Sequence, residues 1–194
     1  NSSTYDELKG YYDNVIILDK STYKSNNDEP TPISCVEEMI EKLPAELWQR
    51  DHLKILDPCC GSGNFALPIV LKKLAAHKTK REIMEEIIHF NDINEQRLEN
   101  VRKIYSADTY HLQITSQDFL KNNFTKGTFD LVVANPPYAK ILENGKRASK
   151  NHNLIKDFIE KALSQLKPNG YLLFITPDNW MSYADRNVLI EIIT

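Results

Sequence analysis

Cysteine is scarce in this sequence, and no apolar stretch is long. The three cysteines, Cys35, Cys59 and Cys60, are an odd number and two are adjacent, so neither a disulfide framework nor a zinc-ligand spacing is available. No apolar run approaches membrane-spanning length, and no signal-peptide pattern opens the chain. We therefore expect a protein of the reducing cytoplasm, with no membrane partner and no metal.

An excess of positive charge is also missing. The formal net charge of -3 argues against a compact nucleic-acid-binding module, although an enzyme can carry one local basic surface. Basic side chains do recur in the polar segment 139–153, at Lys140, Lys146, Arg147, Lys150 and His152. That segment is either a solvated loop or a surface that faces phosphates. The chain length and a hydrophobic content of 41% suffice for one domain with a sizeable core.

The segment Asn135-Pro136-Pro137-Tyr138 carries the clearest chemical signal. It follows Phe129–Ala134, an apolar run that predicts a buried strand, and its two prolines end that strand. An amine such as adenine N6 is a poor nucleophile, because its lone pair is delocalised into the ring. The Asn135 side-chain oxygen and the Pro136 carbonyl could accept its two hydrogens and make it more nucleophilic. Tyr138 could stack on a base that has left its helix. The alternative is a strand followed by a rigid turn with a surface tyrosine.

A glycine turn between a strand and a helix indicates a ligand site. The strand Leu53–Asp57, the turn and a helix over about 66–74 form the opening of a nucleotide-binding α/β unit. Gly61 and Gly63 allow close backbone approach, and Asp57 offers a carboxylate to a ligand amine or hydroxyl. The turn lacks both the Gly-Lys-Ser/Thr of a phosphate loop and the full dinucleotide spacing, so a ligand without phosphates fits better. We interpret the adjacent cysteines as small side chains packed under the turn.

Two further acidic residues follow predicted strands. Asp92 ends the strand predicted over 87–92, where a carboxylate is placed to accept hydrogen bonds from ribose hydroxyls. Asp118 follows the strand predicted over 112–115, and it could receive an adenine amino group while Phe119 packs nearby. Isolated acids in such places are more often loop caps. Their recurrence after successive strands favours a ligand site.

The segment before the glycine turn is predicted to contain a helix. Thr31 is its expected N-cap, with Pro32 at the first helical position. The helix is either a well-capped surface helix or one whose N-terminus holds a ligand carboxylate. Its apolar stripe is Val36, Met39, Ile40 and Leu43. We interpret residues 1–30 as a polar extension and connector, in which the apolar patch 15–18 is either a short strand or part of a docking surface.

Helices and strands continue to alternate toward the end of the chain. Helices are predicted over 94–105 and 158–166, and Pro168-Asn169-Gly170 is expected to close the second. A fifth strand is predicted over 171–176. Another helix begins at Ser182 and is still running at the last residue.

These motifs occur in an order typical of one enzyme family. The order is Thr31-Pro32-x-x-x-Val36-x-x-Met39, Asp57-Pro58-x-x-Gly61-Ser62-Gly63-x-Phe65, Asp92, Asp118, Asn135-Pro136-Pro137-Tyr138, Phe158-x-Glu160-Lys161-Ala162 and Leu166-Lys167-Pro168-x-Gly170. Over about residues 28–181 the chain resembles the S-adenosylmethionine-dependent DNA N6-adenine methyltransferases of bacterial restriction-modification systems. It has their gamma-type order, in which the cofactor motifs precede the catalytic motif.

The resemblance implies a fold and a set of roles. The fold is α/β and Rossmann-like, with a mostly parallel sheet of order 3-2-1-4-5 and helices on both faces. Asp92 would bind the ribose of S-adenosylmethionine, and Asp118 and Phe119 would contact the amino edge of its adenine. Ile93 and Phe158 would sandwich that adenine. The methionine portion would be held by Thr31, Asp57, Pro58, Cys59, Gly61, Ser62, Gly63 and Phe65, with Asn135 alongside. The flipped target base would be positioned by Asn135, Pro136, Pro137 and Tyr138, with direct transfer and no covalent enzyme intermediate.

The sequence departs from the family pattern at its C-terminal end. Family members continue with more strands, an aromatic motif that grips the flipped base and a target-recognition domain, whereas this chain stops in the helix after the fifth strand. We therefore expect residues 31–194 to be an incomplete catalytic domain that acts on double-stranded DNA. Its expected partners are a restriction subunit, or a fused nuclease and recognition domain. The alternatives are a methyltransferase acting on RNA or on a protein glutamine, and a non-catalytic cofactor-binding or assembly subunit.

Overall fold

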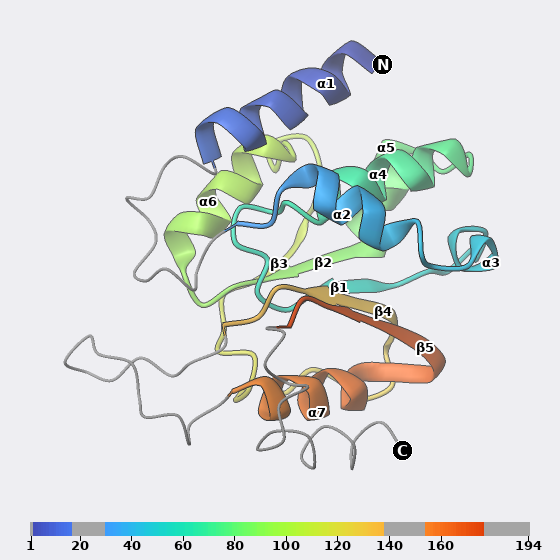
Figure 1. The fold of residues 1–194 in the computed structure, drawn as a ribbon, viewed down its shortest axis with the longest axis vertical. Helices are drawn as coiled ribbons and strands as arrows, with labels where there is room; N and C mark the ends of the chain where they lie inside the picture. The colour runs from blue at the N-terminus through green and yellow to red at the C-terminus, as the bar shows by residue number, and fades with distance from the viewer. Residues whose placement is uncertain (1, 17–29, 138–153, 177–194) are drawn as a thin grey trace.

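A parallel β-sheet forms the centre of the protein. The computed structural model describes residues 2–16, 30–137 and 154–176. Within these residues, parallel strands form one sheet in the order β3-β2-β1-β4-β5 (Figure 1). The strands are β1 Ile55–Asp57, β2 Ile88–Asn91, β3 Gln113–Thr115, β4 Phe129–Ala134 and β5 Leu166–Phe174. The predicted sheet and its strand order are confirmed.

The central strands are mostly apolar, because both faces of the sheet are covered; Asp57 and Asp130 are the exceptions in β1 and β4. Every residue of β1 and of β4 is buried. The register pairs Ile55 of β1 with Ile88 of β2 on one side and with Leu131 of β4 on the other. Since the strands are parallel, this register brings their carboxyl ends to one edge of the sheet.

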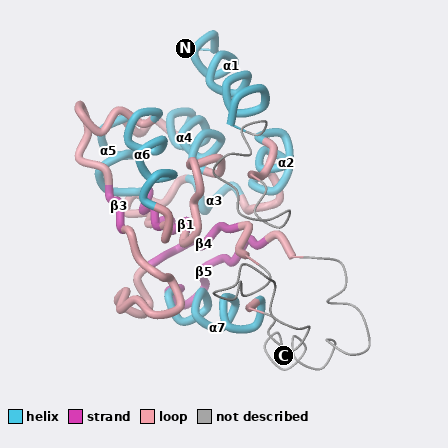
Figure 2. The backbone as a smooth tube through the Cα atoms, turned by 90° about the vertical axis from the view of Figure 1, so that its left-hand side faces the viewer, coloured by secondary structure: helices cyan, strands magenta, loops and turns pink. Residues whose placement is uncertain are grey.

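Helices lie on both faces of the sheet, as predicted. Figures 1 and 2 show α2 to α6 on one face and α7 on the other. The larger core cluster, which includes Val36 and Leu131, lies on the first face, and a smaller cluster with Leu56 and Phe158 lies on the second. The bounds are α2 Ile33–Ile40, α3 Ala45–Trp48, α4 Ala66–Ala75, α5 Lys80–Glu82, the π-helical turn η3 Ile83–Ile87, α6 Glu95–Ile104 and α7 Ile155–Gln165.

Helix α2 is capped differently from the prediction. Its N-cap residue is Pro32, and no side chain caps it, so the expectation that Thr31 is the N-cap is wrong. The Thr31 hydroxyl instead accepts a hydrogen bond from Asn135, far along the chain. The apolar stripe of the helix is confirmed, since Val36 and Ile40 are buried and the other two stripe residues pack against the same core.

The junction between α7 and β5 also differs from the prediction. The helix ends at Gln165 and the strand begins at Leu166, so Pro168–Gly170 lies within the strand instead of closing the helix. The register of β5 against β4 shifts over this stretch. Asn169 has a left-handed φ of 61°, and a Cβ on Gly170 would come within 3.2 Å of a β4 carbonyl oxygen. These turn-forming residues therefore make a bulge, and the strand starts earlier than expected.

The N-terminal segment forms a helix that the sequence analysis did not predict. Helix α1, Ser2–Tyr11, runs into a π-helical turn η1, Tyr12–Ile16. Tyr12 is fully buried in a cluster with Ile33 and Leu67, and Figure 1 shows α1 lying over the end of α6. Residues 15 and 16 are in η1, so the patch 15–18 is not a strand there. Positions 17 and 18 lie outside the described residues.

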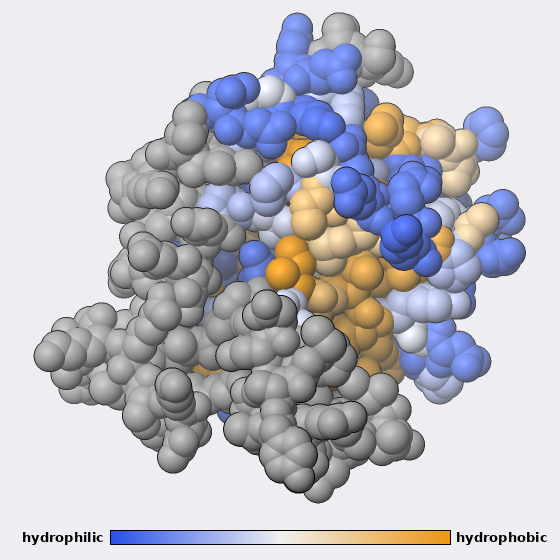
Figure 3. Space-filling view, in the orientation of Figure 1, coloured by the Kyte–Doolittle hydropathy of each residue, from blue (hydrophilic) through white to orange (hydrophobic). Residues whose placement is uncertain are grey.

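The surface of the described residues is mixed in polarity. Figure 3 shows hydrophilic side chains over α1 and hydrophobic ones gathered near the middle of the same face. Among the helices that the structure describes, none is long and apolar enough to cross a membrane. The basic segment 139–153 and the helix predicted from Ser182 lie outside the described residues.

Candidate functional site

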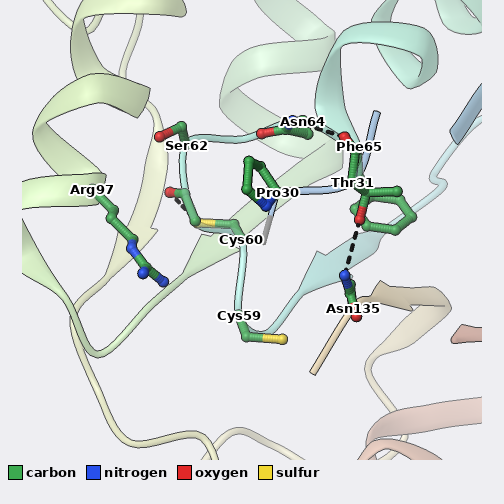
Figure 4. A pocket seen from close by; sticks show the side chains of 10 residues that line it. Pro30, Thr31, Cys59, Cys60, Ser62, Asn64, Phe65, Arg97 and Asn135 are labelled. Carbon is green, nitrogen blue, oxygen red and sulfur yellow. Dashed lines mark hydrogen bonds between the residues drawn. The ribbon is translucent and has the colours of Figure 1, made fainter. Parts of the chain in front are cut away.

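A pocket opens at the carboxyl edge of the sheet, where three distant segments meet beside Arg97 of α6 (Figure 4). They are the start of the α2 segment, the glycine turn after β1 and the turn after β4. Strand order reverses between β1 and β4, and ligands of open parallel sheets bind at such a switch point. The pocket is lined by Pro30, Thr31, Cys59, Cys60, Gly61, Ser62, Asn64, Phe65, Arg97 and Asn135.

The glycine turn has a backbone shape that requires glycine. Gly61 and Gly63 have φ angles of 55° and 87°, a region that side chains with a Cβ rarely adopt. The Gly61 N–H donates to Oδ2 of Asp92 at 2.8 Å, and Oδ1 of Asp92 accepts the Asn94 N–H at 2.8 Å. Asp92 thus fastens the turn to the end of β2.

Thr31 connects the glycine turn to the turn after β4. Its backbone carbonyl accepts a hydrogen bond from Nδ2 of Asn64 at 2.9 Å, and its hydroxyl accepts one from Nδ2 of Asn135 at 3.3 Å. The second bond sets the orientation of the Asn135 amide. Figure 4 shows its nitrogen toward Thr31 and its oxygen on the opposite side.

Asp57 ends β1, two residues before Cys59 of the pocket lining, and is 3% exposed. Within the described part of the chain, neither of its carboxylate oxygens has a hydrogen-bond partner. Burial raises the pKa of this carboxyl well above its usual range. The nearby Cys59 backbone N–H, which lies outside hydrogen-bonding geometry, offsets part of the rise, and the nearby Asp92 adds to it. A buried carboxylate in this state suits a ligand that brings hydrogen-bond donors or positive charge.

The residues expected to hold an adenine ring lie outside the pocket lining. Ile93 is 72% exposed, which is unusual for an aliphatic side chain that follows a buried strand. Phe119 and Phe158 are buried, and their rings stack with centroids 5.8 Å apart. The Asp118 carboxylate accepts the Leu120 N–H at 3.1 Å and pairs with Lys121 at 3.3 Å. Asp118 therefore caps its own turn and is half-buried.

The two adjacent cysteines have different surroundings. Cys60 is buried, and burial raises the pKa of its thiol, with further increases from Asp57 and Asp92. The interpretation that it packs under the turn is confirmed. Cys59 is half-buried and packs against the smaller core cluster, and both cysteines also line the pocket.

The Asn-Pro-Pro-Tyr turn is described only in part. Pro136 is buried and Pro137 is exposed, while Asn135 is half-buried at the pocket. The predicted role of Tyr138 falls outside the described residues. Pro58 precedes the pocket lining, and its carbonyl accepts a hydrogen bond from Asn91 at 2.8 Å.

Several residues that build the site were missed from the sequence. Asn91 donates to the carbonyls of Pro58 and Gln117 and accepts from the Thr115 hydroxyl at 2.8 Å, which ties the ends of β1, β2 and β3 together. Its sequence signal is an amide side chain at the end of an apolar strand, and this signal could have identified Asn91. Arg97 lines the pocket from α6, and Tyr12 and Tyr105 contact the glycine turn from beneath. Nothing in their local sequence distinguishes these three.

The fold and the position of the pocket indicate which structural class of protein this chain belongs to. One similar solved structure is described as a class I S-adenosylmethionine-dependent methyltransferase from Listeria monocytogenes. It superposes with a TM-score of 0.62 and 21% identity, covering 97% of this chain and 59% of that one. The sheet order and this likeness give the protein the Rossmann-like methyltransferase fold.

The sequence comparisons narrow the class to a family. Residues 59–192 match the family described as Eco57I restriction-modification methylase, and the chain belongs to this family. The type II methyltransferase M.PaeR7I of Pseudomonas aeruginosa is 28% identical over 158 residues, which is 66% of this chain and 27% of that protein. The tRNA1(Val) (adenine(37)-N6)-methyltransferase of Haemophilus influenzae is 32% identical over 136 residues, which is 65% of this chain and 54% of that protein. The chain thus spans between about a quarter and a half of these relatives.

Proposed function

We propose that this chain carries the catalytic domain of a methyltransferase that transfers a methyl group from S-adenosylmethionine to N6 of adenine in double-stranded DNA. The observation that carries the proposal is the orientation of Asn135 at the pocket. Its Nδ2 donates to Thr31, which points its side-chain oxygen in the opposite direction. That oxygen is directed where a target amine could donate to it. Membership of a restriction-modification methylase family supports DNA as the substrate.

The buried carboxylate of Asp57 supports S-adenosylmethionine as the cofactor. This molecule carries positive charge on its amine and its sulfonium sulfur, and Asp57 offers two oxygens that have no hydrogen-bond partner among the described residues. Opposite charge nearby would restore the ionised form of Asp57. We assign the methionine portion to Thr31, Asp57, Pro58, Cys59, Gly61, Ser62, Gly63 and Phe65.

The nucleoside portion is assigned to the ends of β2 and β3. Asp92 would accept hydrogen bonds from the ribose hydroxyls. Ile93 would support the adenine ring, and its high exposure supports this role. Phe158 would take the opposite face, with Asp118 and Phe119 at the amino edge. Because Phe158 is only 5% exposed, we expect Ile93 to supply most of the contact area.

The chain's own groups act on the target amine. The bound cofactor would supply an electrophilic methyl group on positively charged sulfur. Asn135 Oδ1 and the Pro136 carbonyl would accept the two amine hydrogens, which localises the nitrogen lone pair toward the methyl group. Tyr138 would stack on the base once it has left the helix. The nitrogen–methyl bond would form as the sulfur–methyl bond breaks, which leaves the sulfur neutral. The surplus proton on the nitrogen would pass to solvent, because neither Asn135 Oδ1 nor the Pro136 carbonyl is basic enough to keep it.

We further propose that residues 31–194 belong to the catalytic domain of a longer protein. Sequence recognition and DNA cleavage would then reside in other domains or in a restriction subunit. This chain covers only 27% of the M.PaeR7I methyltransferase, which supports this division. Residues 2–16 pack against the same domain, so they contribute to it as well.

A second candidate function is methylation of adenine in RNA. The similarity to the tRNA1(Val) enzyme favours it, because that relative acts on adenine N6 in a different nucleic acid. The same pair of acceptors would also serve a glutamine amide, which is planar and carries two hydrogens. The three substrates present different groups to Asn135: an adenine amine in DNA, an adenine amine in RNA or a glutamine side-chain amide. The following experiment distinguishes them.

Transfer of a radiolabelled methyl group tests the proposal. The natural chain that contains these residues is given labelled S-adenosylmethionine with unmethylated DNA, total RNA or a protein lysate. Label recovered from DNA as N6-methyladenine is the expected result. Label found only in RNA or only in protein would show that DNA is not the substrate. Binding of cofactor without any transfer would favour a non-catalytic assembly subunit.

Replacing Asn135 by alanine tests its role directly. Asn135→Ala removes one acceptor and should lower the transfer rate by at least about a hundredfold, since one preorganised hydrogen-bond partner is worth this much in other enzymes. The affinity for S-adenosylmethionine, measured by calorimetry, should change little. Asn123→Ala, at an exposed asparagine in a loop, is the matched control and should transfer normally. An Asn135→Ala enzyme with wild-type rate would refute the mechanism.

A further inference from the structure

Two buried tyrosine hydroxyls hold the glycine turn from beneath. Tyr12 donates to the Ser62 carbonyl oxygen at 2.8 Å, and Tyr105 donates to the Gly63 carbonyl oxygen at 2.7 Å. The side chains are 0% and 6% exposed, and the two hydroxyl oxygens lie 3.1 Å apart. Each hydroxyl has one proton, so each of these consecutive carbonyls has a donor of its own.

The ring of Tyr105 also packs directly against the turn. A Cβ on Gly63 would lie 2.8 Å from Cε2 of Tyr105 and 3.5 Å from the Tyr12 hydroxyl oxygen. The Tyr105 ring is backed by Phe90, at a centroid distance of 5.3 Å. Asn100 adds a longer contact of 3.4 Å to the Ser62 hydroxyl. The face of the turn that is turned away from the pocket is therefore filled by side chains at contact distance.

We propose that Tyr12 and Tyr105 are positioning residues that keep the turn in its ligand-binding shape, and that the N-terminal segment α1–η1 is consequently part of the cofactor site. The inference rests on the proposed function, because it takes the turn to bind S-adenosylmethionine. A trans peptide points its N–H opposite to its carbonyl. Holding the Ser62 carbonyl therefore fixes the Gly63 N–H, which donates to the Cys60 carbonyl at 2.8 Å and closes the turn. Holding the Gly63 carbonyl fixes the N–H of Asn64, a residue that lines the pocket.

Removing the Tyr12 hydroxyl would leave the buried Ser62 carbonyl without a donor among the residues that the structure describes. A buried carbonyl in that state is unfavourable, and the peptide can relieve it by rotating toward the pocket. The cofactor would then have to restore the turn as it binds, so the change appears as weaker affinity. By reciprocity, bound cofactor should stabilise the packing of residues 2–16.

Tyr5 provides a matched control on the same helix. Its hydroxyl donates to the Glu37 carboxylate, which tethers α1 to α2 without touching the glycine turn. Tyr5→Phe and Tyr12→Phe each remove one hydroxyl that anchors the N-terminal segment. Only Tyr12→Phe removes a contact with the turn.

The test measures cofactor affinity and hydrogen exchange on the natural chain. By calorimetry, Tyr12→Phe should weaken S-adenosylmethionine binding about tenfold, equal to about 1.4 kcal/mol, and Tyr5→Phe should stay within about twofold of wild type. S-adenosylmethionine should slow amide hydrogen exchange in residues 2–16 of the wild type and of Tyr5→Phe, but not of Tyr12→Phe. If Tyr12 only stabilised the fold, Tyr12→Phe and Tyr5→Phe would change cofactor affinity and hydrogen exchange alike.

The outcomes separate this inference from the proposed function. Wild-type protein that does not bind S-adenosylmethionine would overturn the proposed cofactor and this inference with it. Wild-type binding with unchanged affinity in Tyr12→Phe, or equal weakening in both variants, would overturn only the inference. If Tyr12→Phe does not fold, Tyr105→Phe decides, since it keeps the ring beside Gly63 and removes its hydroxyl donor. The Gly63 carbonyl keeps the Ala66 N–H at 3.0 Å, so the expected weakening is smaller than tenfold, and an affinity within about twofold of wild type would overturn the inference.

Discussion

At the scale of single residues, a carboxylate at the end of β1 is buried in a way that lowers the stability of the folded protein at neutral pH. Asp57 is at the end of a fully buried strand, and its raised pKa means that the folded protein favours the protonated form. Stability from this group is fully present below the unfolded pKa of about 3.9 and is lost as the pH rises through the folded pKa. At neutral pH the ligand-free protein therefore carries an unfavourable buried group.

Asp57→Asn should stabilise the ligand-free protein and weaken cofactor binding. At pH 7 we expect the free energy of unfolding to rise by about 1–2 kcal/mol, because the buried charge is removed. The gain over wild type should shrink as the pH falls and disappear well below the unfolded pKa of about 3.9, where Asp57 is protonated in both states. Urea unfolding at several pH values and calorimetry with S-adenosylmethionine check both parts. Asp108→Asn, at an exposed turn, should change neither, and a destabilised Asp57→Asn protein would contradict the interpretation.

At the scale of elements, one acidic side chain joins the starts of three strands. Asp130 in β4 accepts from Arg50 at 3.0 Å, from the Lys54 N–H at 2.9 Å and from Lys167 at 2.8 Å. Burial alone would raise the pKa of Asp130, but Lys167, the Lys54 N–H and Arg50 outweigh it and hold the pKa below its usual value. This cluster lies next to the irregular register between β4 and β5.

Asp130→Asn should lower the free energy of unfolding by about 2 kcal/mol at pH 7. The estimate is moderate because the partners are partly exposed and solvent screens them. A depressed pKa contributes stability that is present above the unfolded pKa of about 3.9 and is lost as the pH falls through the folded pKa. Urea unfolding should therefore show the difference at pH 7 and little of it near pH 2. Glu99→Gln, in an exposed pair with Arg102, should cost at most about 0.5 kcal/mol.

At the scale of the whole molecule, ligand binding and folding are linked. S-adenosylmethionine at about a hundred times its dissociation constant should stabilise the natural chain by about 2.7 kcal/mol. ATP shares the adenosine portion but brings phosphates, for which the turn has no phosphate-loop sequence, so it should stabilise far less. Thermal unfolding with each ligand tests this. Equal stabilisation by ATP would place recognition in the adenosine alone.

The sheet and the pocket could be predicted because their sequence signals are local and strong. The apolar run 129–134, the glycines of the turn and the acids after strands each follow from backbone or burial physics within a few residues, and the parallel order places them at one edge. Tyr12 could not be found in this way, because its role depends on a contact with Ser62 across 50 positions of sequence. The start of β5 was missed for a related reason: Pro168–Gly170 has the composition of a helix stop, but pairing with β4 absorbs it as a bulge.

The burial of Cys60 gives the turn a chemical reporter. Its thiol is 5% exposed and has a raised pKa, so a maleimide or a disulfide reagent should reach it only when the turn opens. Cys35 and Cys59 are half-buried and should react sooner, which leaves the slow phase to one sulfur. The rate of that slow phase then measures how often the glycine turn opens in the native protein, and no reactive residue has to be introduced by mutation.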